Sequence, residues 1–284
     1  MPDLLVSRAE LLAEAARLLG EAGVAEPRRE AARIWSWLER VPAAAVTPDD
    51  GAAVAPERTA RFRSAVRRRA AGEPLAHVTG WAGFRHLTLR SDRRALIPRP
   101  ETEGLVDLLL ARVRTGRVAD VGTGTGCMAL SLALEGAFEL VTGIDLSSEA
   151  LALARQNRDE TGARVALVQG DLTHVLAARS LDALISNPPY LTSQEYGALD
   201  ASVREWEPEL ALAGGPDGLA AIDLLLVDGR RVLRPGAWVA LEVDEARAAQ
   251  CAARAGGSGY TDIAIHTDLF GRERYLLARR SDAE

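Results

Sequence analysis

Residues 120–126 read Asp120-Val121-Gly122-Thr123-Gly124-Thr125-Gly126 and lie between an apolar run and a helical pattern that begins at Cys127. Glycines let the backbone turn tightly and approach a ligand closely, and the first turn of a helix offers unpaired N–H groups to an anion. The spacing differs from the GxGxxG pattern of nicotinamide sites, because the sixth position is Cys127. The stretch predicts a strand, a ligand-binding turn and a helix; a turn that serves only packing is the alternative.

Strands and helices alternate from this turn onward. The apolar patterns predict strands at 118–121, 140–144, 164–168, 183–186 and 238–243, and helices at 127–134, 148–158, 219–233 and 246–255. Such alternation is typical of a mostly parallel sheet covered by helices, with ligands at the carboxyl ends of the strands. Two final strands, 262–266 and 274–278, have no helix between them and imply an antiparallel edge. The predicted fold class is therefore α/β with a Rossmann-like sheet.

A different residue pattern precedes the predicted sheet. Ser7 and Glu10 form a capping box, and apolar residues then recur at helical spacing within residues 1–72, which predicts a bundle of short helices. Residues 73–100 are rich in glycine, proline and alternating apolar residues, which predicts an ordered β-hairpin linker. The sequence therefore predicts a helical domain (1–72), a hairpin linker (73–100) and an α/β domain (101–284).

The composition is that of an ordinary globular protein, with 48% hydrophobic and 26% charged residues among 284. No run approaches the roughly 18 to 20 apolar residues of a membrane span, and the first thirty positions are too charged for a secretory signal, so we expect a cytoplasmic protein. Two cysteines and four scattered histidines predict no metal site. Residues 1–100 carry 17 Arg against 12 acidic residues (+5), and residues 101–284 carry 17 against 28 (−11). The acidic α/β domain argues against a nucleic-acid partner.

Acidic residues follow the next two predicted strands. Asp145 lies nineteen residues after Gly126, at the end of the second strand, where a carboxylate can accept hydrogen bonds from both hydroxyls of a ribose. Asp171 lies at the end of the third strand, where it could bind the amino group of an adenine; a turn or helix cap is the alternative role. The glycine turn lacks the lysine that a nucleoside triphosphatase places there. The turn and the two acids together predict a nucleoside pocket.

The fourth strand ends in Ser186-Asn187-Pro188-Pro189-Tyr190. Prolines have no N–H and direct the backbone rigidly, so the Asn187 side-chain oxygen and the Pro188 carbonyl become fixed acceptors. Two acceptors can hold the two hydrogens of a planar NH₂ group, orient its lone pair and favour its pyramidal form. Tyr190 would provide an aromatic wall. The motif therefore predicts Asn187, Pro188, Pro189 and Tyr190 as a catalytic site that acts on an amino or amide nitrogen.

These motifs resemble those of class I S-adenosylmethionine-dependent methyltransferases, and the chain more closely resembles the release-factor glutamine methyltransferases, the PrmC/HemK family. Further stretches carry this likeness along nearly the whole chain. They are Gly72-Glu73-Pro74-Leu75 with Gly80 and Phe84, Leu96-Ile97-Pro98-Arg99-Pro100-Glu101-Thr102-Glu103, Glu207-Pro208, Gly214-Gly215-Pro216-Asp217-Gly218-Leu219 and Asp268-Leu269-Phe270-Gly271-Arg272. The Arg99 stretch is the most discriminating, because a general amino methyltransferase does not need it.

The resemblance implies S-adenosylmethionine as cofactor, S-adenosylhomocysteine as product and class 1 peptide-chain release factors as protein substrates. The methyl group would go to the side-chain nitrogen (N5) of the glutamine in the Gly-Gly-Gln motif, with the helical domain helping to hold the substrate and the enzyme acting as a monomer. The implied cofactor-binding residues are Gly122, Thr123, Gly124, Thr125, Gly126, Asp145, Asp171, Leu172 and Asn187. The implied substrate-binding residues are Asn187, Pro188, Pro189, Tyr190, Arg99 and Glu101.

Three of these positions have alternative interpretations. The position after Asp171 is often a large aromatic residue in the family, and here it is Leu172, so stacking on the adenine would be weaker or come from elsewhere. Arg99 and Glu101 could instead form a loop ion pair that fixes the hairpin.

Two other classes of function remain open to the sequence. DNA adenine N6 methyltransferases also use an Asn/Asp-Pro-Pro-aromatic motif on a flipped base, but they need a basic DNA-binding face or a target-recognition domain. A non-enzymatic module that binds the ribosome or a translation factor would not need the intact glycine turn, Asp145 and Asn187 motif. Both are therefore weaker hypotheses than the glutamine methyltransferase.

Overall fold

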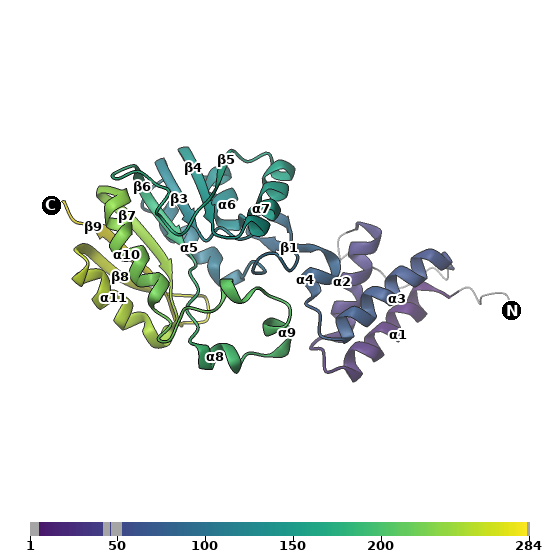
Figure 1. Cartoon of the computed structure of the whole chain (residues 1–284). Coiled ribbons are helices and arrows are strands. Elements are labelled where there is room, and N and C mark those ends of the chain that lie inside the picture. Colours follow the sequence, from purple (N-terminus) through teal and green to yellow (C-terminus); the bar gives the residue numbers. More distant parts are fainter. Residues whose placement is uncertain (1–5, 42–45, 47–52, 283–284) are drawn as a thin grey trace. The chain divides into compact units, whose positions relative to one another are not determined.

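The computed structural model describes residues 6–41, 46 and 53–282. The chain divides into two compact units, one drawn from residues 1–81 and 200–206 and the other from residues 82–199 and 207–284 (Figure 1). Parts of two predicted domains lie outside the described residues, namely 1–5, 42–45 and 47–52 of the helical domain and 283–284 of the α/β domain. Within the described ranges, no helix combines the length and the apolar character needed to cross a membrane.

The first unit is a bundle of short helices. They are α1 (Arg8–Glu21), α2 (Pro27–Glu39), α3 (Pro56–Ala70), α4 (Leu75–Thr79) and α9 (Ala201–Arg204). The predicted capping box begins α1, because the Ser7 hydroxyl accepts from the Glu10 backbone N–H and the Glu10 carboxylate accepts from the Ser7 N–H. Trp35 and Phe62 meet edge to face in the apolar core of this unit, with ring centroids 5.1 Å apart.

The predicted hairpin is present as β1 (Trp81–Phe84) and β2 (Leu87–Arg90). Its turn is held by Arg85, which forms ion pairs with Glu135 at 2.6 Å and with Asp107 at 2.7 Å. The chain then enters α5 (Pro100–Leu110), a helix that is not among the predicted elements. Its signal is a proline in the first turn followed by buried apolar residues at helical spacing.

The second unit is built on a seven-stranded sheet. The strands are β3 (Thr115–Val121), β4 (Ala137–Asp145), β5 (Val165–Gln169), β6 (Leu181–Ser186), β7 (Leu233–Glu242), β8 (Tyr260–Thr267) and β9 (Glu273–Arg280). They lie in the order β5-β4-β3-β6-β7-β9-β8, with β3 to β7 parallel and β9 antiparallel to both of its neighbours. This topology confirms the predicted α/β fold, its mostly parallel sheet and its antiparallel edge.

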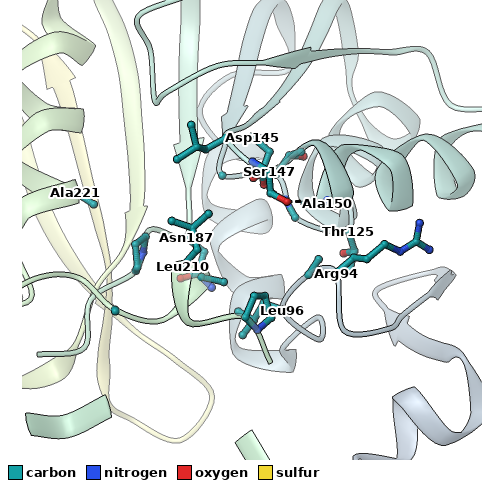
Figure 2. Close-up of a pocket in the computed structure, with 18 of the residues that line it drawn as sticks. Arg94, Leu96, Thr125, Asp145, Ser147, Ala150, Asn187, Leu210 and Ala221 are labelled. Carbon is teal, nitrogen blue, oxygen red and sulfur yellow. Dashed lines mark hydrogen bonds between the residues drawn. The ribbon is translucent and has the colours of Figure 1, made fainter. Parts of the chain in front are cut away.

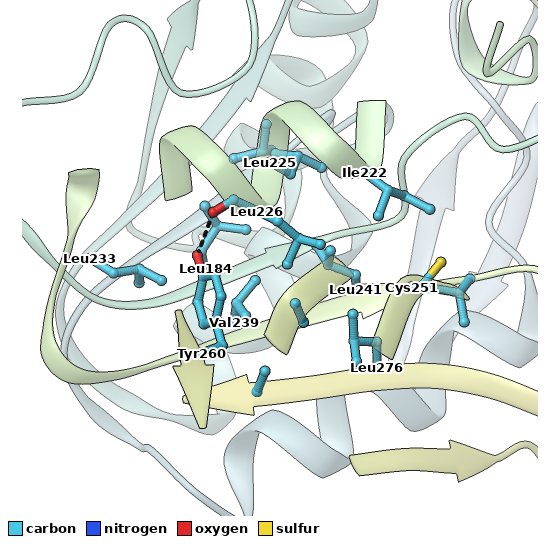
Figure 3. Packing of buried hydrophobic residues seen from close by; sticks show 14 of the residues in the cluster. Leu184, Ile222, Leu225, Leu226, Leu233, Val239, Leu241, Cys251, Tyr260 and Leu276 are labelled. Carbon is cyan, nitrogen blue, oxygen red and sulfur yellow. Dashed lines mark hydrogen bonds between the residues drawn. The ribbon is translucent and has the colours of Figure 1, made fainter. Parts of the chain in front are cut away.

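Helices cover both faces of this sheet. The remaining α-helices of the unit are α6 (Cys127–Glu135), α7 (Ser148–Thr161), α8 (Ser193–Gly197), α10 (Ala220–Val232) and α11 (Ala248–Gly257). Leu184 packs with α10 and α11, whereas its neighbours Ala183 and Ile185 pack with α5 and α6, so the strand's period of two supplies both cores. Figure 3 shows Leu225 and Leu226 of α10 near Leu184, and the Tyr260 hydroxyl donates to the Leu226 carbonyl at 3.0 Å.

The strand register brings the predicted motifs to one edge of the sheet. In the parallel pairs, Val121 lies beside both Ile144 and Ser186, and Ser186 lies beside Leu241. The glycine turn follows β3, Asp145 ends β4 and the Asn187 motif follows β6, so they lie together with the end of β7 at the carboxyl ends of neighbouring strands. Ligands bind at this position in open α/β sheets.

Candidate active site

A cavity of about 420 Å³ opens at this edge, entirely within the second unit. Its volume is within the range of pockets that bind nucleoside-sized molecules. Figure 2 shows Asp145, Asn187, Leu96 and Leu210 around it. The predicted site residues that line it are Arg99, Gly122, Thr123, Gly124, Thr125, Asp145, Asp171, Leu172, Asn187 and Pro189. The lining does not include Glu101, Gly126, Pro188 or Tyr190.

Asp120 supports the glycine turn through hydrogen bonds to its side chain. Its side chain is fully buried, and Oδ2 accepts from the Thr123 hydroxyl at 2.7 Å and from the Ala129 N–H at 3.0 Å. Burial raises the pKa of Asp120 to about 7, although the two hydrogen bonds act in the opposite direction. Because Asp120 is absent from the cavity lining, we interpret it as a support of the turn.

Asp145 joins the glycine turn to the start of α7. Its Oδ2 accepts from the Gly124 N–H at 2.8 Å, and its Oδ1 accepts from the Ser147 N–H at 2.9 Å. An ionised carboxylate has about four lone-pair sites, so acceptor capacity remains toward the cavity. Burial raises the pKa of Asp145, opposed by the backbone hydrogen bonds. The residue therefore fits a group that offers two hydroxyls, as the ribose of S-adenosylmethionine does.

Asp171 and Leu172 line the cavity. They follow β5, the outermost strand on the side of the sheet opposite β8. Leu172 has φ +47°, and its side chain also packs against the core beneath α10. A leucine offers apolar contact to a base but no aromatic stacking. The adenine roles of both residues stay predictions.

Asn187 lies directly after β6 and lines the cavity. Its Nδ2 donates to the Thr102 hydroxyl at 3.2 Å, and that hydroxyl donates to the Glu242 carboxylate at 2.6 Å. Pro189 shares the lining, whereas Pro188 is buried beneath it. Tyr190 lies outside the lining, and burial raises the pKa of its hydroxyl to about 12. The structure thus places an amide side chain at this wall of the cavity.

A glycine-rich segment packs against the backbone of the Asn187 motif. A Cβ on Gly214 would lie 2.6 Å from the Pro189 carbonyl oxygen, and one on Gly218 would meet the Tyr190 carbonyl oxygen. Gly218 also has φ +74°, which an L side chain rarely adopts. These glycines are needed because two backbone segments touch here.

Gly218→Ala is expected to destabilise the protein by about 1–3 kcal/mol, through backbone strain and displacement of the Tyr190 carbonyl. Urea unfolding of the variant and the wild type gives the difference. Gly197→Ala is the matched control, because Gly197 lies in α8 with an ordinary φ and with nothing within 4 Å of the position that a Cβ would take. Equal unfolding midpoints for Gly218→Ala and the wild type would contradict the close-contact interpretation.

The Arg99 stretch is tied to a distant glutamate. Arg99 Nη2 lies 2.6 Å from Glu207 Oε1, and the Ile97 N–H donates to Glu207 Oε2 at 3.0 Å. The Glu207 side chain is buried, so this ion pair fixes the wall of the cavity formed by residues 96–99. The ion-pair partner of Arg99 is thus Glu207 and not the predicted Glu101, whose backbone carbonyl accepts from the Tyr275 hydroxyl.

Sequence reasoning missed part of the lining. It did not assign several lining residues: Arg94, Leu96 and Ile97 after the hairpin, Ser147 and Ala150 at the start of α7, Leu210 and Ala211 between β6 and α10, and Ala221 and Leu224 in the first turns of α10. Residues 96–97 belong to a stretch that carried the family resemblance, so a signal existed for them. Leu210 and Ala221 are ordinary apolar residues, and nothing in their local sequence marks them.

Known proteins resemble this chain over nearly its whole length. The family model for the methyltransferase small domain matches residues 100–209, and the model for the PrmC N-terminal domain matches residues 10–80. The chain is 40% identical over 280 residues to the release factor glutamine methyltransferase of Moorella thermoacetica, covering 96% of this chain and 98% of the relative. The corresponding protein of Deinococcus radiodurans is 40% identical over 278 residues, with 96% and 98% covered.

Solved structures support the fold. A crystal structure of a methyltransferase from Pyrococcus furiosus superimposes with a TM-score of 0.53 at 20% identity, covering 79% of this chain and 98% of that chain. At this identity the similarity shows the fold alone. The 40% identity over nearly the full length is stronger evidence than this fold similarity, and it shows that the chain belongs to the release factor glutamine methyltransferase family.

Proposed function

We propose that this protein transfers the methyl group of S-adenosylmethionine to N5 of the glutamine in the Gly-Gly-Gln motif of class 1 peptide-chain release factors. The observation that carries the proposal is Asn187, whose side chain lines a nucleoside-sized cavity next to the glycine turn and Asp145. Family membership supports the same reaction.

The residues that would hold the cofactor are the glycine turn (122–126), Asp145 at the ribose, and Asp171 with Leu172 at the adenine. When bound, S-adenosylmethionine supplies an electrophilic methyl group on a positively charged sulfur. Asp145 fits this role because its two observed hydrogen bonds leave acceptor sites on a carboxylate that faces the cavity.

We expect two acceptors to orient the nitrogen that reacts: the Asn187 side-chain oxygen at the cavity wall, and the carbonyl of Pro188, a residue that is itself buried outside the lining. The lone pair of an amide nitrogen is delocalised into its carbonyl, so attack requires the NH₂ group to become partly pyramidal. Two fixed acceptors hold its two hydrogens and direct the lone pair toward the methyl group. The oriented nitrogen would take the methyl group that the bound cofactor supplies, and it would release one of its two protons to water. Orientation by acceptors therefore replaces a strong base.

The DNA adenine methyltransferase hypothesis is not favoured. Residues 101–284 carry a formal charge of −11, which repels a polyphosphate backbone, and both relatives compared above are release factor glutamine methyltransferases. Translation termination is a cytoplasmic process, so the proposal also locates the enzyme in the cytoplasm, where we expect it to act as a monomer.

Incubation with labelled S-adenosylmethionine and purified release factor tests the proposal. We expect one methyl group on the peptide that contains Gly-Gly-Gln, and none when its glutamine is replaced by glutamate. Duplex DNA is the parallel substrate. Label in the DNA and not in the release factor would overturn the proposal.

Two exposed apolar residues are candidates for contact with the release factor. Leu269 and Phe270, 98% and 70% exposed, lie in the turn before β9, and the Asp268 carboxylate fixes this turn by accepting from the Phe270 and Arg272 N–H groups. The turn lies at the carboxyl end of β7, because Tyr275 pairs with Glu242. It therefore shares the sheet edge with Asn187.

The double variant Leu269→Ser with Phe270→Ser is expected to raise the KM for the release factor about 30-fold, since truncating an apolar anchor at an interface costs about 1 kcal/mol or more and two are removed. Steady-state methylation kinetics provide the measurement. Leu134→Ser is the control, because Leu134 is 48% exposed at the end of α6, on the opposite edge of the sheet. An unchanged KM in the double variant would exclude this turn from substrate binding.

A further inference from the structure

A buried carboxylate lies behind Asn187. Glu242, at the end of β7, is 2% exposed, and it accepts a 2.6 Å hydrogen bond from the hydroxyl of Thr102 in α5, itself 3% exposed. The same hydroxyl accepts from Asn187 Nδ2 at 3.2 Å. Three segments far apart in the sequence therefore form one hydrogen-bonded chain that ends at the cavity wall. Glu242 itself does not line the cavity.

The number of hydrogens sets the direction of this chain. A carboxylate only accepts hydrogen bonds, and a threonine hydroxyl has a single hydrogen to donate. Because that hydrogen goes to Glu242, the Thr102 oxygen can only accept from Asn187. Within the Asn187 side chain only the NH₂ end can donate. The two ends of a side-chain amide have nearly the same shape, so the partners alone determine which end faces the cavity.

We propose that Glu242 is a positioning residue, which acts through Thr102 to keep the Asn187 amide turned so that its oxygen faces the substrate. This inference rests on the proposed function, because it concerns the acceptor for the substrate NH₂ group. A flipped Asn187 would present its own NH₂ group to the glutamine NH₂ group. Two donors facing each other lose the hydrogen bond and leave both groups unpaired. The chain therefore prevents an inactive orientation of Asn187.

Ionisable groups on several elements surround Glu242. Arg274 and Arg99 lower its pKa, Glu101 raises it, and Tyr190, Tyr275 and Asp244 interact with the same cluster. Burial dominates and raises the pKa of Glu242 to about 7. Below that pH a protonated Glu242 can donate to Thr102, and the Thr102 hydrogen is then free to turn toward the Asn187 oxygen. We therefore expect kcat to fall as the pH decreases through about 7.

Three variants test this hydrogen-bonded chain from Glu242 to Asn187. Thr102→Val keeps the shape but removes the hydroxyl, and we expect kcat to fall about 10- to 100-fold, while the Kd for S-adenosylmethionine changes by less than about threefold. Thr102→Ser restores the hydroxyl and should recover most of the activity. Glu242→Gln can either donate or accept, so it should lower kcat and remove the acid limb of the pH profile. Thr79→Val is the matched control, because Thr79 is a buried threonine whose hydroxyl donates to the Leu75 carbonyl and which is not part of the cavity lining.

A second readout does not depend on activity. In the side-chain amide region of a nitrogen–proton NMR spectrum, the Asn187 NH₂ signal, identified by its loss in Asn187→Asp, should shift in Thr102→Val and return toward its original position in Thr102→Ser. An unchanged NMR signal and a wild-type kcat in Thr102→Val would overturn the positioning role. Failure of the wild-type enzyme to methylate release factors would instead contradict the proposed function, and the NMR comparison would still decide the orientation of Asn187.

Discussion

Asn187→Ala is expected to lower kcat for methylation of a release factor by about two to three orders of magnitude, as for the loss of one preorganised hydrogen-bonding group in other active sites. The variant retains Pro188, Pro189 and Tyr190 but loses the acceptor that, in our proposal, holds one hydrogen of the substrate NH₂ group. If that contact strengthens in the transition state, the effect falls on kcat and not on cofactor affinity. Single-turnover methylation, with S-adenosylmethionine binding measured in parallel by calorimetry, separates the two.

Asn187→Asp is the matched control for shape. It keeps an acceptor toward the cavity, but it cannot donate to Thr102 and it adds a second negative charge near Glu242. Its charge would also attract the sulfonium in the ground state. We therefore expect activity between those of the wild type and Asn187→Ala. Near-normal chemistry in Asn187→Ala would mean that Asn187 only shapes the loop, and the orientation mechanism would have to be abandoned.

Asp145→Ala is expected to weaken the binding of S-adenosylmethionine by about 1.5–3 kcal/mol, the loss of hydrogen bonds to a charged acceptor. The variant also frees the Gly124 and Ser147 N–H groups, which now donate to the carboxylate, so the glycine turn loses a support. Isothermal titration calorimetry measures the change. NAD should not compete in the same experiment, because the glycine spacing differs from a nicotinamide site.

The control for this variant is Asp159→Ala, which removes an exposed carboxylate from α7 outside the cavity lining. The pH dependence gives a further check. Because the pKa of Asp145 is raised, the carboxylate becomes protonated at a higher pH than usual, and affinity should start to decrease earlier on acidification in the wild type than for an exposed aspartate. Unchanged cofactor affinity in Asp145→Ala would refute the ribose assignment.

The local sequence predicted the strands of the sheet because the signals for a strand, an apolar run and its flanking turn residues, are themselves local. Each predicted strand from 118–121 to 274–278 overlaps an observed strand, since a strand needs only a short apolar or alternating run between turn residues. The glycine turn and the residues after β4 and β6 follow from the same logic, because parallel strands end at one edge.

The remainder of the site depends on contacts between distant residues. Glu207 lies 108 residues from Arg99, and Glu242 lies 140 residues from Thr102, so no spacing rule links them. Glu242 had one local signal, an acidic residue at the end of an apolar strand. That signal does not reveal which hydroxyl faces it.

The sequence by itself determined the fold class, the family resemblance and four of the loops that line the cavity, because these depend on periodicity and on residue types at strand ends. Only the tertiary structure decided which side chains complete the cavity and how Asn187 is oriented. The physical reason is that the strand order β3-β6-β7 and the packing of α5 bring Thr102 and Glu242 together behind Asn187. A hydrogen bond requires its atoms to lie within about 3 Å of each other, and only the packed sheet brings these residues that close.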